Sequence, residues 1–285
     1  MFEMFHLDFI VQAFIVSIII GVLLSYLGVH VVGRGIVFVD LALGQISSLG
    51  VAFSDYVGYG KTIIPIAFAL AGALLMSLIT IRDKRLKLEA VIGIIYAVAS
   101  AATVMLISKT PHGDSDIQEV LFGNILSVNW GQITTVGIIF AILAIVHLVF
   151  HKKFFLLTET FENHEPSEAA TIFRANKWFK FWNFIFYISI GLAIVFAVRT
   201  SGVIPVFSFL IIPSVAAIML CKKNLHIVVV AVIMSILAAF FGLYVSYHYD
   251  FPAGSSLVAV LGVLFVFASI VYVFIRKKRV AAEAK

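Results

Sequence analysis

Long apolar runs, each long enough to cross a lipid bilayer as a helix, follow one another along almost the whole of this 285-residue sequence. A membrane helix needs about 20 mostly apolar residues, whereas a barrel strand alternates apolar and polar residues. Hydrophobic residues make up 62% of the chain and charged residues 12%, against roughly 25% charged in a soluble domain. The sequence therefore predicts an all-α, polytopic membrane protein, and it excludes a soluble enzyme, a disordered chain and a coiled coil.

About nine membrane spans are predicted from runs of this length. A short apolar stretch at 117–128 cannot cross a bilayer and predicts a re-entrant or interfacial helix. Eight spans plus a re-entrant helix is therefore the alternative count. The nine ranges are 9–32, 36–53, 63–81, 90–107, 133–150, 182–198, 203–220, 227–245 and 257–275.

The basic residues predict the orientation of these spans. If the N-terminus lies outside, all but Lys61, Lys109 and Arg199 of the 20 Lys and Arg residues fall on the cytoplasmic side, as the positive-inside rule requires. Topology thus explains the net charge of +5 without a nucleic-acid partner. Residues 1–8 carry two acids and no Lys or Arg, which does not fit a cleaved signal peptide. We expect a multi-pass protein with its C-terminus in the cytoplasm.

The whole chain, 1–285, is expected to form one transmembrane domain, because no polar segment is long enough to fold alone. The longest, 151–180, is predicted to be a cytoplasmic loop. Pro166 and Glu168 suit the first turn of a helix, which predicts a short helix over 167–179. This helix is either a solvated loop element or a docking element for a cytosolic partner.

The second predicted span is the most polar. It carries Asp40, Gln45, Ser47 and Ser48, and ionisable groups inside a span are expensive enough to be functional candidates. Asp40, Ser47 and Ser48 share one side of the helix, and Gln45 lies about a third of a turn away. A carboxylate, an amide and two hydroxyls can line a polar pathway, whereas small residues and hydroxyls alone would also serve helix packing.

Two other groups of residues are weaker candidates for metal ligands. His147 and His151 are spaced to share one helix face, but Lys152 and Lys153 follow them, so anchoring at the membrane interface is the favoured interpretation. Outer loops contain imidazoles and carboxylates that could form an acidic mouth for divalent cations, although ordinary solvated loops are the alternative. The residues of this mouth are His112, Asp114, Asp116, His248 and Asp250.

The sequence contains none of the GxGxxG, GxxxxGK[ST], HExxH or GxSxG motifs. If the protein uses ATP, the ATP site is therefore expected on another chain. The single cysteine, Cys221, excludes an internal disulfide and a cysteine-based metal cluster.

Four stretches, in this order, carry a resemblance to a known family. They are RGIVFVDLALGQISSLGVA at 34–52, EAVIGIIYAVAS at 89–100 followed by LFGNILS at 121–127, SGVIPVFSFLIIPSVAA at 201–217, and GLYVSYHYDFPAG at 242–254. Together they resemble the membrane permease of ABC importers for zinc, manganese or iron. The family often shows a GDxLxH pattern in its second helix. In an alignment on the LGVA end, Gln45 stands at the His position and Leu41 at the Asp position, with Asp40 one residue earlier.

The resemblance implies a permease that carries out no bond chemistry itself. It implies two copies around the translocation pathway in a bacterial inner membrane, cytosolic ATP-binding cassette subunits and an extracytoplasmic metal-binding protein. The metal is then the substrate, no cofactor is bound permanently, and Gln45 in place of His favours manganese or ferrous iron. The residues expected to couple to the ATPase are Glu162, Glu165, Glu168, Ala169, Ala170 and Arg174. A siderophore or corrin permease is the first alternative, and a membrane scaffold or intramembrane enzyme is the second.

Overall fold

The computed structural model describes the chain except for residues 1–2, 80–86, 110–124, 164–167, 169–175 and 284–285, and it describes no side chains at 163 and 277–283. Its described residues are helical almost throughout, without strands. The elements are η1 (Glu3–His6), α1 (Asp8–Gly33), α2 (Val39–Val57), α3 (Ile63–Leu78), α4 (Leu88–Ile107), η2 (Ile125–Ser127), α6 (Trp130–Val149), α7 (His151–Asn163), α9 (Lys177–Ser201), α10 (Val203–Leu220), α11 (Asn224–Tyr249) and α12 (Ala253–Glu283).

Each predicted apolar range coincides with one of these helices, which confirms the all-α membrane fold. By length and composition, 7 of the described helices can cross a membrane: α1, α4, α6, α9, α10, α11 and α12. The apolar helix α3 is shorter, with 16 residues, and the polar side chains of α2 lower its mean hydropathy. Of the predicted re-entrant stretch, residues 125–128 are described, and they contain the single turn η2.

Helix α7 was not expected, because the charged residues around it indicate a loop. Its apolar residues Phe154, Leu157 and Phe161 recur at three- and four-residue spacing, so they lie on one face of a helix. Phe154 and Leu157 are fully buried, and Phe161 packs against the same core. The helix predicted over 167–179 falls largely outside the described residues. Of this range, Glu168 and residues 177–179 at the start of α9 are described and helical.

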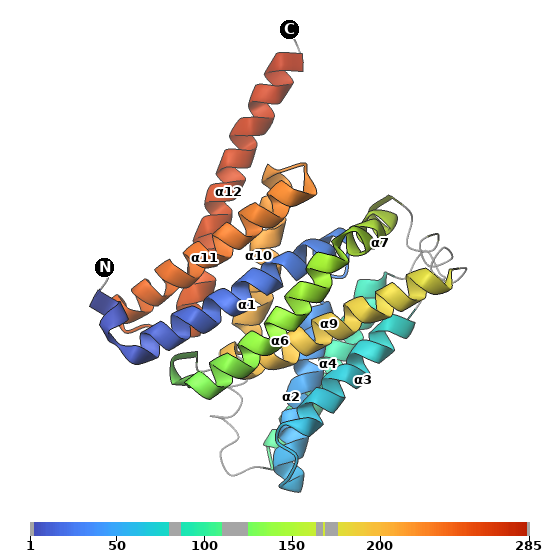
Figure 1. Cartoon of the computed structure of the whole chain (residues 1–285), viewed down its shortest axis with the longest axis vertical. Helices are drawn as coiled ribbons and strands as arrows, with labels where there is room; N and C mark the ends of the chain where they lie inside the picture. Colours follow the sequence, from blue (N-terminus) through green and yellow to red (C-terminus); the bar gives the residue numbers. More distant parts are fainter. Residues whose placement is uncertain (1–2, 80–86, 110–124, 164–167, 169–175, 284–285) are drawn as a thin grey trace.

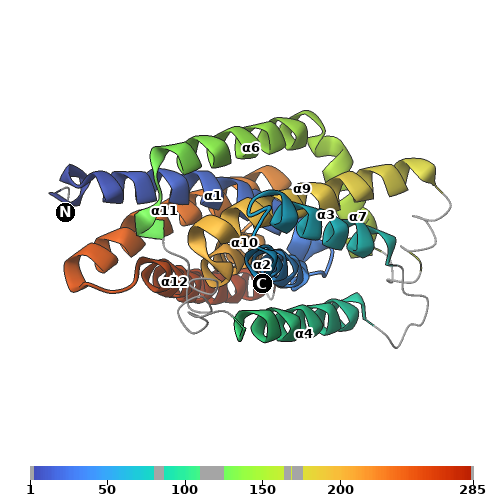
Figure 2. The same cartoon turned by 90° about the horizontal axis from the view of Figure 1, so that it is seen from below.

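The helices form two groups that α9 connects (Figure 1). In the first group, α1 packs against α10 and α11, and α12 packs against α10 and α11 in turn. In the second, α2 packs against α3 and α4. Helix α9 contacts α2 and α3 on one side and α1, α6, α7 and α10 on the other. From below, α6 and α4 lie on opposite faces of the molecule, with α2, α9 and α10 between them (Figure 2).

The two helices α1 and α10 cross at backbone contact. A Cβ atom on Gly28 would lie 1.8 Å from the carbonyl oxygen of Leu210, so no larger residue fits there without displacing a helix. Next to this crossing, the hydroxyl of Ser214 donates to the carbonyl oxygen of Ser25 at 2.8 Å. Small residues that bring backbones together are typical of helix packing in membranes.

The remaining surface is strongly apolar. In α12, 11% of the span is buried within the chain, whereas the value for α9 and α10 is 61%. Helix α12 also projects beyond the other helices at its C-terminal end (Figure 1). Exposed Val, Ile and Phe side chains of this kind are expected to face lipid in a membrane.

Candidate functional site

The polar side of α2 is buried inside the protein. Asp40, Gln45, Ser47 and Ser48 are each no more than 5% exposed. A Cβ atom on Gly44, which shares the side of Asp40 and Ser48, would lie 3.6 Å from Val198 of α9. The polar side of α2 therefore faces the junction between α9 and α10, while its Ile46 packs against Gly72 of α3.

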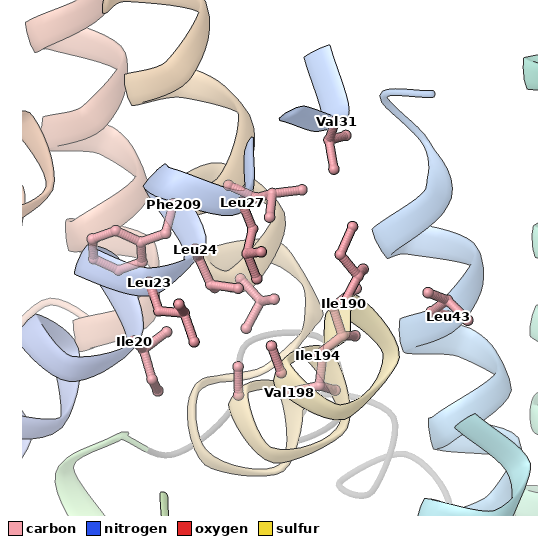
Figure 3. Close-up of a cluster of buried hydrophobic side chains, with 14 of the residues drawn as sticks. Ile20, Leu23, Leu24, Leu27, Val31, Leu43, Ile190, Ile194, Val198 and Phe209 are labelled. Atoms are coloured by element: carbon pink, nitrogen blue, oxygen red, sulfur yellow. The ribbon is translucent and has the colours of Figure 1, made fainter. Parts of the chain in front are cut away.

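The core on this side of the molecule is otherwise apolar. Figure 3 shows Ile190, Ile194 and Val198 of α9 between side chains of α1 and Leu43 of α2. These residues belong to one continuous hydrophobic cluster. A carboxylate that borders such a cluster loses most of its hydration, so it needs a partner or a ligand.

Asp40 has no such partner on another helix among the described residues. Both of its carboxyl oxygens are buried and lack a hydrogen bond of good geometry, and the groups that act on them are the backbone N–H groups of Asp40 and Leu41 at the start of its own helix. The hydroxyl of Ser47 is also without a partner, as is that of Ser201 at the end of α9. Only Ser48 uses its proton, which it donates to the Gly44 carbonyl oxygen at 2.9 Å. The polar side of α2 thus offers oxygen atoms that the rest of the described chain does not occupy.

Arg34 does not fill this role. Arg34 precedes Asp40 by six residues and is the cation nearest to it in the sequence. In the structure, Arg34 donates to Thr158 of α7 at 3.3 Å and to Asn183 of α9 at 3.2 Å. Its guanidinium carbon lies 3.5 Å from the ring centre of Phe186. Asp40 is 2% exposed, so it does not extend to a surface.

A second polar cluster surrounds Arg34 at the end of the bundle where α7 lies. The ring of His30 in α1 contacts Thr158 through its Nδ1 atom at 2.9 Å. The rings of Tyr26, His30 and His147 have their centres 5.0–6.5 Å apart. No pattern marked His30, because the apolar residues of α1 surround the helix on every side.

The expected interfacial role of His147 is wrong. Its side chain is fully buried and stacks on Phe154 at 4.0 Å between ring centres. His151, in contrast, is exposed and its ring nitrogen contacts the Leu148 carbonyl oxygen at 2.8 Å. The difference arises because Phe154 of α7 stacks on His147 and covers it, whereas His151 lies on an exposed part of α7. The two histidines therefore do not share a metal site.

Helix α7 leads toward the residues expected to couple to an ATPase. Its Glu162 lies against Gly33, where an added Cβ atom would be 2.6 Å from the Glu162 Oε1 atom. Partial burial and the neighbouring carboxylate of Glu159 raise the pKa of Glu162 above its ordinary value. Glu168 is exposed and helical. Glu165, Ala169, Ala170 and Arg174 lie outside the described residues.

The expected outer mouth is described only in part. His248 and Asp250 are exposed at the α11–α12 turn, where His248 stacks on Tyr244 with 5.8 Å between ring centres. His112, Asp114 and Asp116 lie outside the described residues. Within the described part of the chain, no three His, Cys, Asp or Glu side chains gather as a metal site would require.

The fold is shared with two solved structures. The first is PsaBC from Streptococcus pneumoniae in complex with Fab, which aligns with a TM-score of 0.76 at 23% identity and covers 92% of this chain and 91% of that chain. The second is an inward-facing conformation of a putative metal-chelate type ABC transporter, with a TM-score of 0.69 at 16% identity, covering 91% of this chain and 85% of that chain.

Curated proteins of similar length also match. The manganese transport system membrane protein MntC of Listeria monocytogenes is 28% identical over 261 residues, covering 92% of this chain and 90% of that protein. The chelated iron transport system membrane protein YfeD of Yersinia pestis is 26% identical over 272 residues, covering 94% and 87%. The sequence model of the ABC 3 transport family matches residues 6–272. The chain therefore belongs to the ABC 3 transport family and is a membrane permease subunit of an ABC transporter.

Proposed function

We propose that this permease imports divalent metal ions, with manganese, iron or zinc as the substrate. The relatives named above are described as manganese and chelated iron transport proteins. The observation that carries the proposal is the polar side of α2, where a buried carboxylate lacks a partner on another helix among the described residues. Carboxylate, amide and hydroxyl oxygens are ligands that Mn²⁺ and other hard divalent cations accept.

In this proposal, Asp40 and Gln45 contact the metal as it passes, and Ser47 and Ser48 provide weaker oxygen ligands further along α2. The four side chains are closed inside the chain in this conformation, so passage requires α2 to separate from the α9–α10 junction. Such a site is expected to bind weakly, because conduction requires that the ion also leaves.

The proposed assembly places two copies of the permease in the bacterial inner membrane. Cytosolic ATP-binding cassette subunits dock at residues 162–175, which begin in the last turn of α7, and an extracytoplasmic protein delivers the metal. The bias of basic residues supports an external N-terminus and a cytoplasmic C-terminus. A reporter that is active only in the cytoplasm should therefore be active when fused after Lys285. A silent fusion that is nonetheless inserted in the membrane would contradict this orientation.

Transport by the reconstituted importer tests the proposed function. The chain is purified with the ATPase subunits that accompany it and placed in proteoliposomes that contain ATP on the ATPase side. We expect uptake of radioactive Mn²⁺, Fe²⁺ or Zn²⁺ that depends on ATP and on the delivery protein. Ferric siderophore and cobalamin serve as comparison substrates. ATP-dependent uptake of either of these, with no uptake of the three metal ions, would refute the proposal.

A further inference from the structure

The hydroxyl of Thr158 joins α7 to the C-terminal end of α1 and has no hydrogen-bonding capacity left. It donates to the Phe154 carbonyl oxygen within α7 at 3.1 Å and accepts from the Arg34 Nε atom at 3.3 Å. Its third contact is the Nδ1 atom of His30 at 2.9 Å. When Thr158 gives its one proton to Phe154, the tautomer of His30 with a proton on Nδ1 donates to the Thr158 hydroxyl. In this arrangement Thr158 accepts two hydrogen bonds from the end of α1. We call the contacts among Thr158, His30 and Arg34 the α1–α7 joint.

Arg34 extends the same joint to α9. Its Nη1 atom donates to Asn183, and Phe186 lies under the guanidinium plane. Arg34 is 7% exposed and Thr158 is 3% exposed, so water cannot readily replace these contacts. Buried hydrogen bonds of charged groups are stronger than those at a surface. The end of α1 therefore follows α7 and α9 closely.

The turn that follows Arg34 connects this joint to α2. The backbone N–H of Gly35 donates to Val32, and that of Ile36 donates to Val31. The N–H of Val39 donates to Ile36, so the turn is held by hydrogen bonds up to the start of α2. Val37 also donates from its backbone to the Glu89 carboxylate of α4 at 3.3 Å. A displacement of Arg34 therefore reaches the first turn of α2, where Asp40 lies.

The joint also contains buried polar atoms that could form other hydrogen bonds. Among the described residues, the Arg34 Nη2 donor and the His30 Nε2 acceptor are both buried and without a partner. Tyr26 and His147 contribute further polar atoms without partners, next to the ring of His30. A network in which every group is satisfied has one favoured arrangement, whereas one with spare donors and acceptors can exchange partners at little cost.

We propose that Thr158 and Arg34 are positioning residues that transmit movement of α7 to the α1–α2 turn and so reposition Asp40 in the transport cycle. This inference rests on the proposed function, because it assigns a role to α7 in coupling to the ATPase. The joint connects the only described polar helix between α6 and α9 to the helix that carries the candidate metal ligands.

The test replaces the Thr158 hydroxyl with a methyl group of the same size. Thr158→Val removes both accepted hydrogen bonds, and Thr158→Ser retains them. Thr103→Val is the matched control, because the buried Thr103 hydroxyl donates only to Ala99 of its own helix. In proteoliposomes of the complete importer, Thr158→Val should lower the Mn²⁺ taken up per ATP hydrolysed at least about fivefold. The two controls should keep the wild-type ratio, and a wild-type ratio in Thr158→Val would overturn the proposal.

A second variant and a second readout cover the remaining outcomes. If Thr158→Val does not accumulate, Asn183→Leu removes the α9 arm alone and should lower the same ratio about twofold; an unchanged ratio would again overturn the proposal. Spin labels at Glu159 and Tyr56, in a Cys221→Ser background, report the distance from α7 to the far end of α2. This distance should change on ATP binding in wild type and Thr158→Ser but not in Thr158→Val. A distance change in all three proteins would refute the proposed transmission through Thr158. This readout does not require metal transport, so it tests the transmission separately from the proposed function.

Discussion

Arg34 and Asp40 lie on either side of one short turn and are both buried, but their surroundings are opposite. Arg34 is held by Thr158, Asn183 and Phe186 from two other helices. Asp40 faces the α9–α10 junction, and its carboxyl oxygens have no partner from another helix among the described residues. A buried charge that has partners stabilises one arrangement, whereas one without partners costs stability and needs another reason to be there. The comparison predicts that loss of Asp40 will affect transport without lowering stability, whereas loss of Arg34 will lower stability as well.

Asp40→Asn is the strongest test of this contrast. The change is nearly isosteric and removes the charge, so it should lower ATP-dependent Mn²⁺ uptake at least about tenfold, which corresponds to a loss of only ~1.4 kcal/mol at the site. The amount of protein in the membrane should not fall. The amount of the permease in the membrane is measured first, and the uptake of radioactive Mn²⁺ is then divided by that amount. Wild-type uptake by Asp40→Asn would remove Asp40 from the metal path.

Arg34→Ala, unlike Asp40→Asn, should lower the stability of the protein. It leaves the Thr158 hydroxyl and the Asn183 carbonyl oxygen short of a donor in a buried site, which costs about 1–3 kcal/mol. Asp40→Asn removes an unpartnered charge, so its stability should stay the same or rise. Thermal unfolding of the two variants in detergent therefore separates them by the sign of the change. Equal destabilisation by both variants would mean that Asp40 is an anchor like Arg34.

The double variant Arg34→Ala with Asp40→Asn sharpens the comparison further. If the two residues do not interact, their effects on the free energy of unfolding should add to within about 0.5 kcal/mol. The four proteins of the cycle are compared under one set of detergent conditions. A coupling energy above that limit would reveal a contact between the two side chains in another conformation of the turn.

Gln45 should give the smallest effect, because a neutral amide contributes less than a carboxylate to a divalent cation. Gln45→Ala is expected to lower Mn²⁺ uptake about two- to threefold. Gln45→His should retain or tighten metal binding and slow release, with Zn²⁺ favoured over Mn²⁺. A comparison of initial uptake rates for both ions measures this. A loss as large as that of Asp40→Asn would show that Gln45 shares the main ligand role.

The helices of this fold could be located from the sequence because lipid imposes a length and a composition on every span. Helix α7 could not be found that way, since it is short and polar, although Phe154, Leu157 and Phe161 carried the signal of its buried face. The polar side of α2 was also predictable, because Asp40 and its neighbours interrupt an apolar helix. The burial of these side chains against the α9–α10 junction could not be predicted, because it depends on how helices distant in the sequence pack.

The partner of Arg34 shows the same limit. Asp40 is the acidic residue nearest to Arg34 in the sequence, but Arg34 donates to the neutral hydroxyl of Thr158, 124 residues away. His147 was placed at the membrane interface because Lys152 and Lys153 follow it, but α7 folds over it. Sequence periodicity marks which side of one helix is polar, and it does not reveal which other element will cover that side.

The crossing of α1 and α10 at Gly28 limits how the permease can change shape. There is no space for even a methyl group between Gly28 and the Leu210 carbonyl oxygen. Sliding of α1 along α10 by one residue would bring a larger side chain against the facing backbone at this crossing. We therefore expect α1 and α10 to move as one unit, with α2 moving relative to this pair when the pathway opens.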